Sequence, residues 1–155
     1  MNSLSQYITE KLHINKDIKV GQEYKYHPKD KDELKSLLEE LLEERGKDAD
    51  LNDIDTSNIT DMKGLFIKLD PHNIDISNWD VSNVTNMSYM FYECENFNSD
   101  LSSWDISNVI NIEWMFYRCK HFNCDLSKWN VNKVKNMTWV FRGTYLKNIP
   151  SWYHE

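Results

Sequence analysis

Three side chains in the second half of the chain have types and a spacing that could bind a metal ion. Cys119, His121 and Cys124 lie within six residues, and zinc in proteins prefers thiolate and imidazole ligands. A structural zinc site needs four ligands, and no fourth cysteine or histidine is spaced to complete a tetrahedron. Cys119 also repeats Cys94, 25 residues earlier, where cysteine can serve as a small apolar residue. We therefore expect packing rather than metal binding, and no cofactor.

Oxygen ligands that could hold calcium recur at another position. An Asn and an Asp, separated by one residue, stand at Asn73/Asp75, Asn98/Asp100 and Asn123/Asp125. Amide and carboxylate oxygens are ligands for calcium. The same short side chains also accept hydrogen bonds from the backbone of turns, which accounts for every copy without an ion. We favour turn capping and keep a calcium site as the alternative.

Motifs for catalysis are missing from the sequence. It contains no Gly-rich phosphate loop, no HExxH and no Ser or Cys nucleophile with an evident paired base. With four glycines in 155 residues, a cofactor-binding loop is not expected either. The sequence predicts a protein that is not an enzyme.

The elements that must position these side chains come from an internal repeat. Residues 55–79, 80–104 and 105–129 are near-copies of 25 residues each, and 130–152 is a copy shortened by two residues. A period of about 20 to 29 residues is typical of leucine-rich repeats, whose stacked units bury a shared core. We refer to the four blocks as repeat units 1 to 4.

Apolar spacing within each unit predicts one short strand and one helix. Leu101, Trp104, Ile106 and Val109 resemble the LxxLxL strand segment of leucine-rich repeats. The next apolar residues fall at i, i+3, i+4 and i+7, the spacing of one helical face, as in Met87, Met90, Phe91 and Cys94. The predicted fold class is α/β, a right-handed leucine-rich-repeat solenoid with five short parallel strands. Helices are expected near 31–45, 61–68, 86–94, 111–119 and 136–142.

The N-terminal part of the chain is expected to cap the repeats. The helix predicted at 31–45 has Asp30 and Glu33 in capping-box spacing and Gly46 as a stop. Its apolar face consists of Leu34, Leu37, Leu38, Leu41 and Leu42. A further short helix is suggested by Leu4, Tyr7, Ile8 and Leu12. We therefore divide the chain into a helical N-terminal segment and cap, 1–49, and a repeat domain, 50–155.

Composition and termini predict the location of the chain. Charged residues interrupt every apolar run in residues 1–25, so no signal peptide is expected, and no segment is long and apolar enough for a membrane span. Cys94 and Cys119 share one repeat position and Cys124 has no evident partner, which argues against disulfides. The sequence predicts a reduced, cytoplasmic protein without a membrane partner.

The repeated sequence motifs resemble those of a known family. Asp105-Ile-Ser, Met115-Phe116, Cys119 and Phe122-Asn123 stand in the order found in the BspA-like leucine-rich repeat family, and the resemblance covers about residues 50–152. Members of that family are mostly bacterial surface or secreted proteins, so the resemblance implies binding rather than catalysis. Short chains of this kind also resemble reading frames of phages and other mobile elements of gut bacteria.

One candidate binding surface is a row of aromatic residues. At about 100° per residue, Tyr89 points away from the predicted apolar face, and Trp114 and Trp139 are its repeat equivalents, with Tyr92 and Tyr117 beside them. Large exposed aromatics often mark partner sites. The alternative is that these rings only stack on one another or pack on residues 1–29.

A second candidate surface is acidic, and we call it the acidic strip. Asp53, Asp55, Asp80 and Asp105 alternate with buried positions on the predicted strands, so they would line one face. The alternative is that they serve solubility and hydrogen bonding within the repeat.

Charge also differs between the two ends of the chain. Residues 30–61 hold twelve acidic and four basic residues, and residues 118–147 hold seven basic residues and one acidic residue. Such asymmetry can orient an encounter with a partner, including head-to-tail self-association. The net charge of −7 argues against nucleic-acid binding.

Three functional hypotheses follow. The first is a non-enzymatic module that binds another protein through the aromatic row or the acidic strip. The second is a phage-type acidic inhibitor that blocks a host enzyme of nucleic-acid handling or defence. The third is a structural subunit of a larger assembly.

Overall fold

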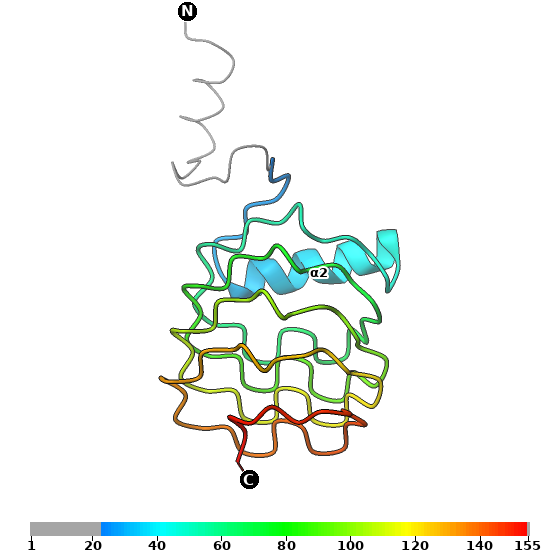
Figure 1. The fold of residues 1–155 in the computed structure, drawn as a ribbon. Helices are drawn as coiled ribbons and strands as arrows, with labels where there is room; N and C mark the ends of the chain where they lie inside the picture. Colours follow the sequence, from blue (N-terminus) through cyan, green and yellow to red (C-terminus); the bar gives the residue numbers. More distant parts are fainter. Residues whose placement is uncertain (1–22, 155) are drawn as a thin grey trace, which may run out of the picture.

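The computed structural model describes residues 23–154 (Figure 1). The α-helix in this range is α2, Lys31–Arg45, and it confirms the helix expected at 31–45. The Asp30 side chain accepts hydrogen bonds from the backbone N–H groups of Asp32 and Glu33. At the other end, Gly46 has φ 90° and donates its N–H to the carbonyl of Leu42. The suggested helix around Leu4, Tyr7, Ile8 and Leu12 lies outside the described residues.

The predicted solenoid of parallel strands and crossover helices is wrong. Within residues 23–154 no strand forms, and neighbouring units are joined by isolated parallel bridges such as Asp61 with Asn86 and Asn86 with Asn111. The segments expected as helices at 61–68, 86–94, 111–119 and 136–142 are turns. The backbone of each unit is therefore a succession of turns.

Tight turns replace the predicted strands. Trp104 donates its N–H to the carbonyl of Leu101 (3.1 Å), and Val109 donates to Ile106 (2.9 Å), so each apolar pair spaced by three closes a turn. Asp100 adds a second bond, because its carboxylate accepts the N–H of Ser102. The apolar spacing that resembles LxxLxL thus arises from two consecutive turns.

Left-handed residues interrupt the predicted helices. An α-helix requires φ near −63° at every residue. In the segment expected at 86–94, Tyr89 has φ 59° and Glu93 has φ 57°. Local bonds run from residue i+3 to residue i, as from Met90 to Met87 (3.2 Å), while alternate N–H groups point to the next unit.

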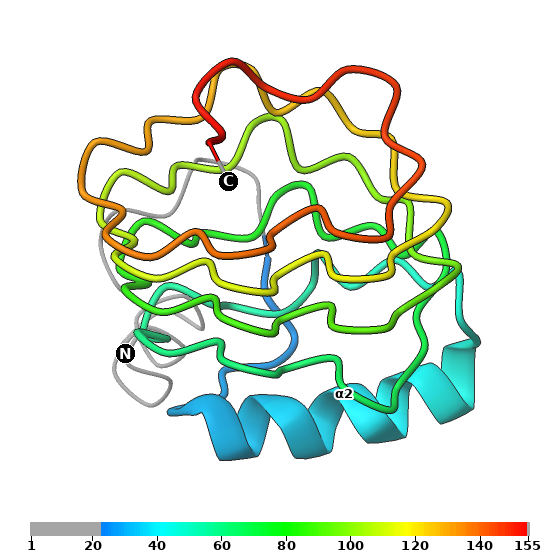
Figure 2. The same ribbon diagram turned by 90° about the horizontal axis from the view of Figure 1, so that it is seen from below.

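These alternate N–H groups join neighbouring units in register. Four residues of unit 2, two apart, donate to carbonyls 24 residues further on: Met87 to Asn111, Tyr89 to Glu113, Phe91 to Met115 and Glu93 to Tyr117. The pattern repeats between units 3 and 4. α2 lies at one end of the resulting stack and the C-terminal unit at the other (Figures 1 and 2).

The burial pattern expected from the sequence is confirmed although the elements differ. Leu101, Trp104, Val109, Met115 and Phe116 are at most 4% exposed, as are the equivalent residues 25 positions earlier. Phenylalanines form a stacked column through the core, with ring centres 5.0 Å apart for Phe66 and Phe91, 5.6 Å for Phe91 and Phe116, and 5.8 Å for Phe116 and Phe141. The buried leucines of α2 belong to the same core cluster.

Tryptophan residues anchor the turns between units. The indole N–H of Trp104 donates to the carbonyl of Ile76 (3.0 Å), and that of Trp129 donates to Leu101 (3.0 Å). Trp79 and Trp104 also stack with ring centres 6.4 Å apart. Each indole thereby adds a second hydrogen bond to a carbonyl that already closes the turn one unit earlier, since Ile76 accepts the backbone N–H of Trp79 (3.1 Å) and Leu101 that of Trp104 (3.1 Å).

Candidate functional site

Five aromatic side chains from units 2 to 4 lie together on the surface, and we call them the aromatic face: Tyr89, Tyr92, Trp114, Tyr117 and Trp139. Tyr89 and Trp114 stack with ring centres 5.9 Å apart and planes 9° apart, and Tyr92 and Tyr117 stack at 5.1 Å and 9°. Trp114 joins the two rows, since its ring centre is 4.7 Å from that of Tyr117. The structure thus brings all five predicted residues together.

Trp139, in unit 4, is the most exposed residue of the aromatic face. Tyr89, Tyr92, Trp114 and Tyr117 are half-buried, whereas Trp139 is 36% exposed. Trp139 meets Trp114 edge to face, with planes 68° apart and ring centres 4.6 Å apart. Because the parallel rings cover each other's faces, they offer a partner mainly their edges, which carry the positive part of the ring quadrupole.

Basic side chains adjoin the aromatic face. The Lys63 amine lies 5.9 Å from the ring centre of Tyr89, and the Arg118 and Arg142 guanidinium groups lie 5.3 Å and 4.4 Å from the ring centres of Tyr117 and Trp139. Arg118 is also paired with Glu93 (3.0 Å). Arg142 has no acidic partner within residues 23–154, so its guanidinium keeps donors for an external carboxylate.

Backbone geometry at the aromatic face is costly for these residues. Tyr89, Trp114 and Trp139 all adopt left-handed φ, at 59°, 56° and 52°. The equivalent residue in unit 1 is Gly64, with φ 62°. A bulky residue in this region costs about 1 to 2 kcal/mol that glycine avoids. Three units therefore carry a large ring where the backbone alone favours glycine.

The N-terminal aspartates of the acidic strip are engaged within the chain. Asp53 receives two hydrogen bonds from the Arg45 guanidinium (3.0 Å each), and these hold the pKa of Asp53 below its usual range. Asp55 lies 3.2 Å from the ring nitrogen Nδ1 of His27. The carbonyl of Asp53 also accepts the N–H groups of Lys25 and Tyr26. These residues attach segment 23–28 to the repeats.

The other two aspartates of the strip are exposed and cap turns. Asp80 accepts the N–H (3.0 Å) and the hydroxyl (2.6 Å) of Ser82, and Asp105 accepts the N–H of Ser107 (3.0 Å). Hydrogen bonds from Ser107 lower the pKa of the Asp105 carboxyl. Because no strand is present here, the expected alternation along a strand does not exist. Asp55, Asp80 and Asp105 share one repeat position and Asp53 another.

The residues considered for metal binding have other roles. Cys119 is buried, its thiol donates to the carbonyl of Phe91 (2.9 Å), and burial raises its pKa. Burial also raises the pKa of Cys124, to about 11, while His121 is exposed. Within residues 23–154 no group of three or more His, Cys, Asp or Glu side chains is arranged for an ion.

The Asn/Asp pairs cap turns and link units. Asp75, Asp100 and Asp125 accept the N–H groups of Ser77, Ser102 and Ser127. The side-chain oxygen of Asn98 accepts the N–H of Asn123, and that of Asn123 accepts the N–H of Lys147. These bonds agree with turn capping, the interpretation that the sequence favours.

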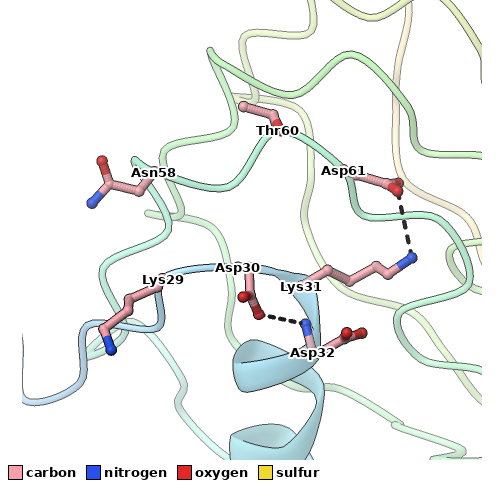
Figure 3. Close-up of a pocket in the computed structure, with 7 residues that line it drawn as sticks. All are labelled: Lys29, Asp30, Lys31, Asp32, Asn58, Thr60 and Asp61. Carbon is pink, nitrogen blue, oxygen red and sulfur yellow. Dashed lines mark hydrogen bonds and ion pairs between the residues drawn. The ribbon is translucent and has the colours of Figure 1, made fainter.

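A polar depression of about 310 Å³ lies where the start of α2 meets unit 1 (Figure 3). Lys31 reaches across it to the Asp61 carboxylate at 3.4 Å, and Asn58 and Thr60 line the opposite side. Its lining side chains are polar, and two of them, Lys31 and Asp61, form an ion pair with each other. It offers no nucleophile and base within hydrogen-bonding distance of each other, and we assign it no function.

Two features of the surface were missed in the sequence. Arg142 stands in the repeat position of Tyr92 and Tyr117, so alignment of the units would have added it to the aromatic face. A third row of turn caps, Asn86, Asn111 and Asn136, also accepts N–H groups two residues on. The signal was the recurrence of Asn or Asp two residues before a small or polar residue.

Comparison with known proteins identifies the family. The model of a family described as a Mycoplasma protein of unknown function, DUF285, matches residues 34–152. The chain belongs to the DUF285 family. The DUF285 match begins inside α2 and runs to the last tryptophan, so it contains the whole aromatic face. No curated protein and no solved structure matched the chain.

Membrane insertion through a helix finds no support in this DUF285 chain. In the part that the structure describes, no helix combines the length and apolar character needed to cross a bilayer.

Proposed function

We propose that the chain is a non-enzymatic module that binds another protein through the aromatic face. The observation that carries this proposal is the presence of Tyr89, Trp114 and Trp139 at backbone positions where unit 1 has Gly64. A residue type held against its backbone preference indicates a compensating role, either packing or function. Stacking supplies part of this compensation, but Trp139 at the end of the row stays 36% exposed.

The chemistry of the face favours a partner segment rich in carboxylates and carbonyls. Ring edges and the Tyr hydroxyls present positive or hydrogen-bond-donating groups, and Arg142 lies directly beside Trp139. Trp, Tyr and Arg are the residue types that most often dominate binding energy in protein interfaces. The repeated sequence motifs support a wider relationship to BspA-like repeat proteins. That relationship agrees with a binding role.

Capture experiments with two double variants test whether binding uses the aromatic face or the acidic strip. Wild-type chain, Trp114→Gly/Trp139→Gly and Asp80→Lys/Asp105→Lys are immobilised and exposed to extract from the organism that encodes the chain. The proposal expects partners that the aspartate variant retains and the tryptophan variant loses. Loss on the aspartate variant alone would assign binding to the acidic strip instead.

A second candidate, an acidic inhibitor of a basic nucleic-acid enzyme, is favoured by one surface. The outer side of α2 carries Glu39, Glu40 and Glu43, all exposed and without an ion pair in residues 23–154. Binding through this surface would weaken steeply with salt, because exposed charges are screened. Capture of a basic protein that Glu40→Lys/Glu43→Lys abolishes, and that the tryptophan variant keeps, would favour this function.

A further inference from the structure

The two ends of the repeat stack are finished differently. At the N-terminal end α2 covers the core, since Leu34, Leu38, Leu41 and Leu42 are at most 4% exposed. At the C-terminal end, unit 4 is the last layer in both views of the chain (Figures 1 and 2). Repeat arrays generally need a terminal cap with a polar outer surface. We call the outer side of unit 4 the open end.

Backbone donors are left unpaired at the open end. In unit 3, Ile112, Trp114, Phe116 and Arg118 donate their N–H groups to carbonyls of unit 4. The equivalent residues of unit 4 are Met137, Trp139, Phe141 and Gly143, and their N–H groups meet no acceptor within residues 23–154. A row of unpaired backbone groups is a ready site for an additional partner.

Apolar side chains are also less buried at this end than in unit 3. Val109 and Ile112 are fully buried in unit 3, whereas their equivalents Val134 and Met137 are only half-buried in unit 4. Ile149 is 62% exposed and Tyr145 is 73% exposed. The open end therefore combines apolar surface with free N–H donors.

Charge indicates what would cover the open end. Unit 4, residues 130–152, carries a net charge of +4, because it holds four basic residues and no acidic residue. Lys135 and Lys147 are exposed and form no ion pair in the described part of the chain. The opposite end carries −8 over residues 30–61, from twelve acidic and four basic residues. The outer side of α2 supplies carboxylates there, and carboxylates accept charge-assisted bonds from backbone N–H groups.

We propose that the open end binds the acidic outer side of α2 of a second copy of this chain, head to tail. This contact is heterologous, so each added copy leaves one open end and one acidic end for the next. The contact is argued from the backbone N–H groups of unit 4 and from Lys135 and Lys147, and not from the rings of the aromatic face. The proposal therefore does not rest on the proposed function.

Sedimentation velocity of the purified full chain tests the proposal through two charge-reversal variants. Lys135→Glu/Lys147→Glu alters the open end, and Glu40→Lys/Glu43→Lys alters α2. The proposal expects the wild-type average mass to rise with concentration from the monomer value of 18.6 kDa toward twice that or more. It also expects the rise to disappear when salt increases from about 0.05 M to about 0.5 M, because the opposed charges are then screened.

Mixing the variants decides the orientation of the contact. In each variant alone the two changed side chains face like charges across the contact, glutamates opposite Glu40 and Glu43 or lysines opposite Lys135 and Lys147, so each variant is expected to stay monomeric. An equimolar mixture should regain the wild-type mass, since these side chains then face opposite charges at every contact between the two variants. Trp114→Gly is the matched control and should associate like the wild type. A wild-type chain that stays monomeric at low salt, a variant that associates alone, or a mixture that stays monomeric would each overturn the proposal.

Discussion

Trp114 and Trp139 meet edge to face at 4.6 Å, whereas Tyr89 and Trp114, one unit earlier, stack in parallel at 5.9 Å. The ring of Trp139 therefore departs from the stack, with the Arg142 guanidinium 4.4 Å from its centre. Trp139 is the most exposed member of the aromatic face, at 36%.

Glycine should replace the tryptophans of the aromatic face at a lower cost in stability than alanine. Trp114→Gly loses four ring contacts worth about 0.5 to 1.5 kcal/mol each, but it relieves about 1 to 2 kcal/mol of left-handed backbone strain. We expect the free energy of unfolding of Trp114→Gly to fall by about 1 to 4 kcal/mol in urea titrations, since strain relief offsets part of the lost ring contacts.

Alanine at the same position is the control for this prediction. Trp114→Ala loses the same ring and keeps most of the strain, so it should be less stable than Trp114→Gly. If the alanine variant is the more stable of the two, left-handed strain does not govern this position.

The central tryptophans should matter more for stability than the terminal one. Trp104 is 4% exposed and its indole N–H bonds to the carbonyl of Ile76, so Trp104→Ala should cost about 3 to 5 kcal/mol. Trp152 is half-buried in the last unit, and Trp152→Ala should cost clearly less. Chemical denaturation measures both. Trp104→Phe keeps a ring and loses the indole bond, so it should fall between the wild type and Trp104→Ala, and equal losses for the Trp104 and Trp152 alanine variants would contradict the burial argument.

The aspartates that cap turns should make the free energy of unfolding depend on pH. Hydrogen bonds from Ser102 and Ser107 lower the pKa values of Asp100 and Asp105 below the ordinary 3.8. A carboxyl with a depressed pKa in the folded state stabilises the fold above its unfolded pKa of about 3.9. This contribution should be complete above about pH 5 and decline as the pH falls through 3.9 toward the lower folded values.

Asparagine tests the acid dependence directly, because it keeps the acceptor oxygen but does not titrate. Asn130 and Asn86 already cap turns in this chain. Asp100→Asn/Asp105→Asn should flatten the fall in the urea midpoint between pH 6 and pH 3. An unchanged slope would show that other carboxyl groups cause the acid sensitivity.

The cap of α2 should contribute separately. Asp30 accepts two backbone N–H groups, so Asp30→Ala should lower the free energy of unfolding by about 1 kcal/mol, whereas Asp30→Ser should largely preserve it. Thermal unfolding followed by circular dichroism measures both. Equal stability of the alanine and serine variants would mean that the cap does not limit the stability of this helix.

The sequence predicted burial and the helix α2 well, and backbone conformation poorly. Residues such as Met87 and Phe91 are buried because their spacing selects one side of the chain, whatever the backbone does. The same spacing cannot distinguish a helix from two turns that include a left-handed residue. Tyr and Glu rarely adopt left-handed φ, so Tyr89 and Glu93 give no sequence signal for that conformation. Gly64 in unit 1, equivalent to Tyr89, and Gly143 in unit 4, equivalent to Glu93, gave that signal.

The candidate site shows the same division. Repeat alignment placed Tyr89, Trp114 and Trp139 in one row, which the structure brings into contact. The pairing of Asp53 with Arg45 depends on how α2 packs on the repeats, and no spacing along the chain encodes it. The predicted acidic strip lost its basis because its alternation required strands.

The affinity of a captured partner for two matched chains tests the account most directly. Isothermal titration compares the wild type with Trp114→Gly/Trp139→Gly, after urea titration has shown that both are folded. Binding through the aromatic face predicts a dissociation constant at least about 30-fold higher for the variant, corresponding to about 2 kcal/mol. A dissociation constant unchanged within about twofold, with the variant fully folded, would contradict it.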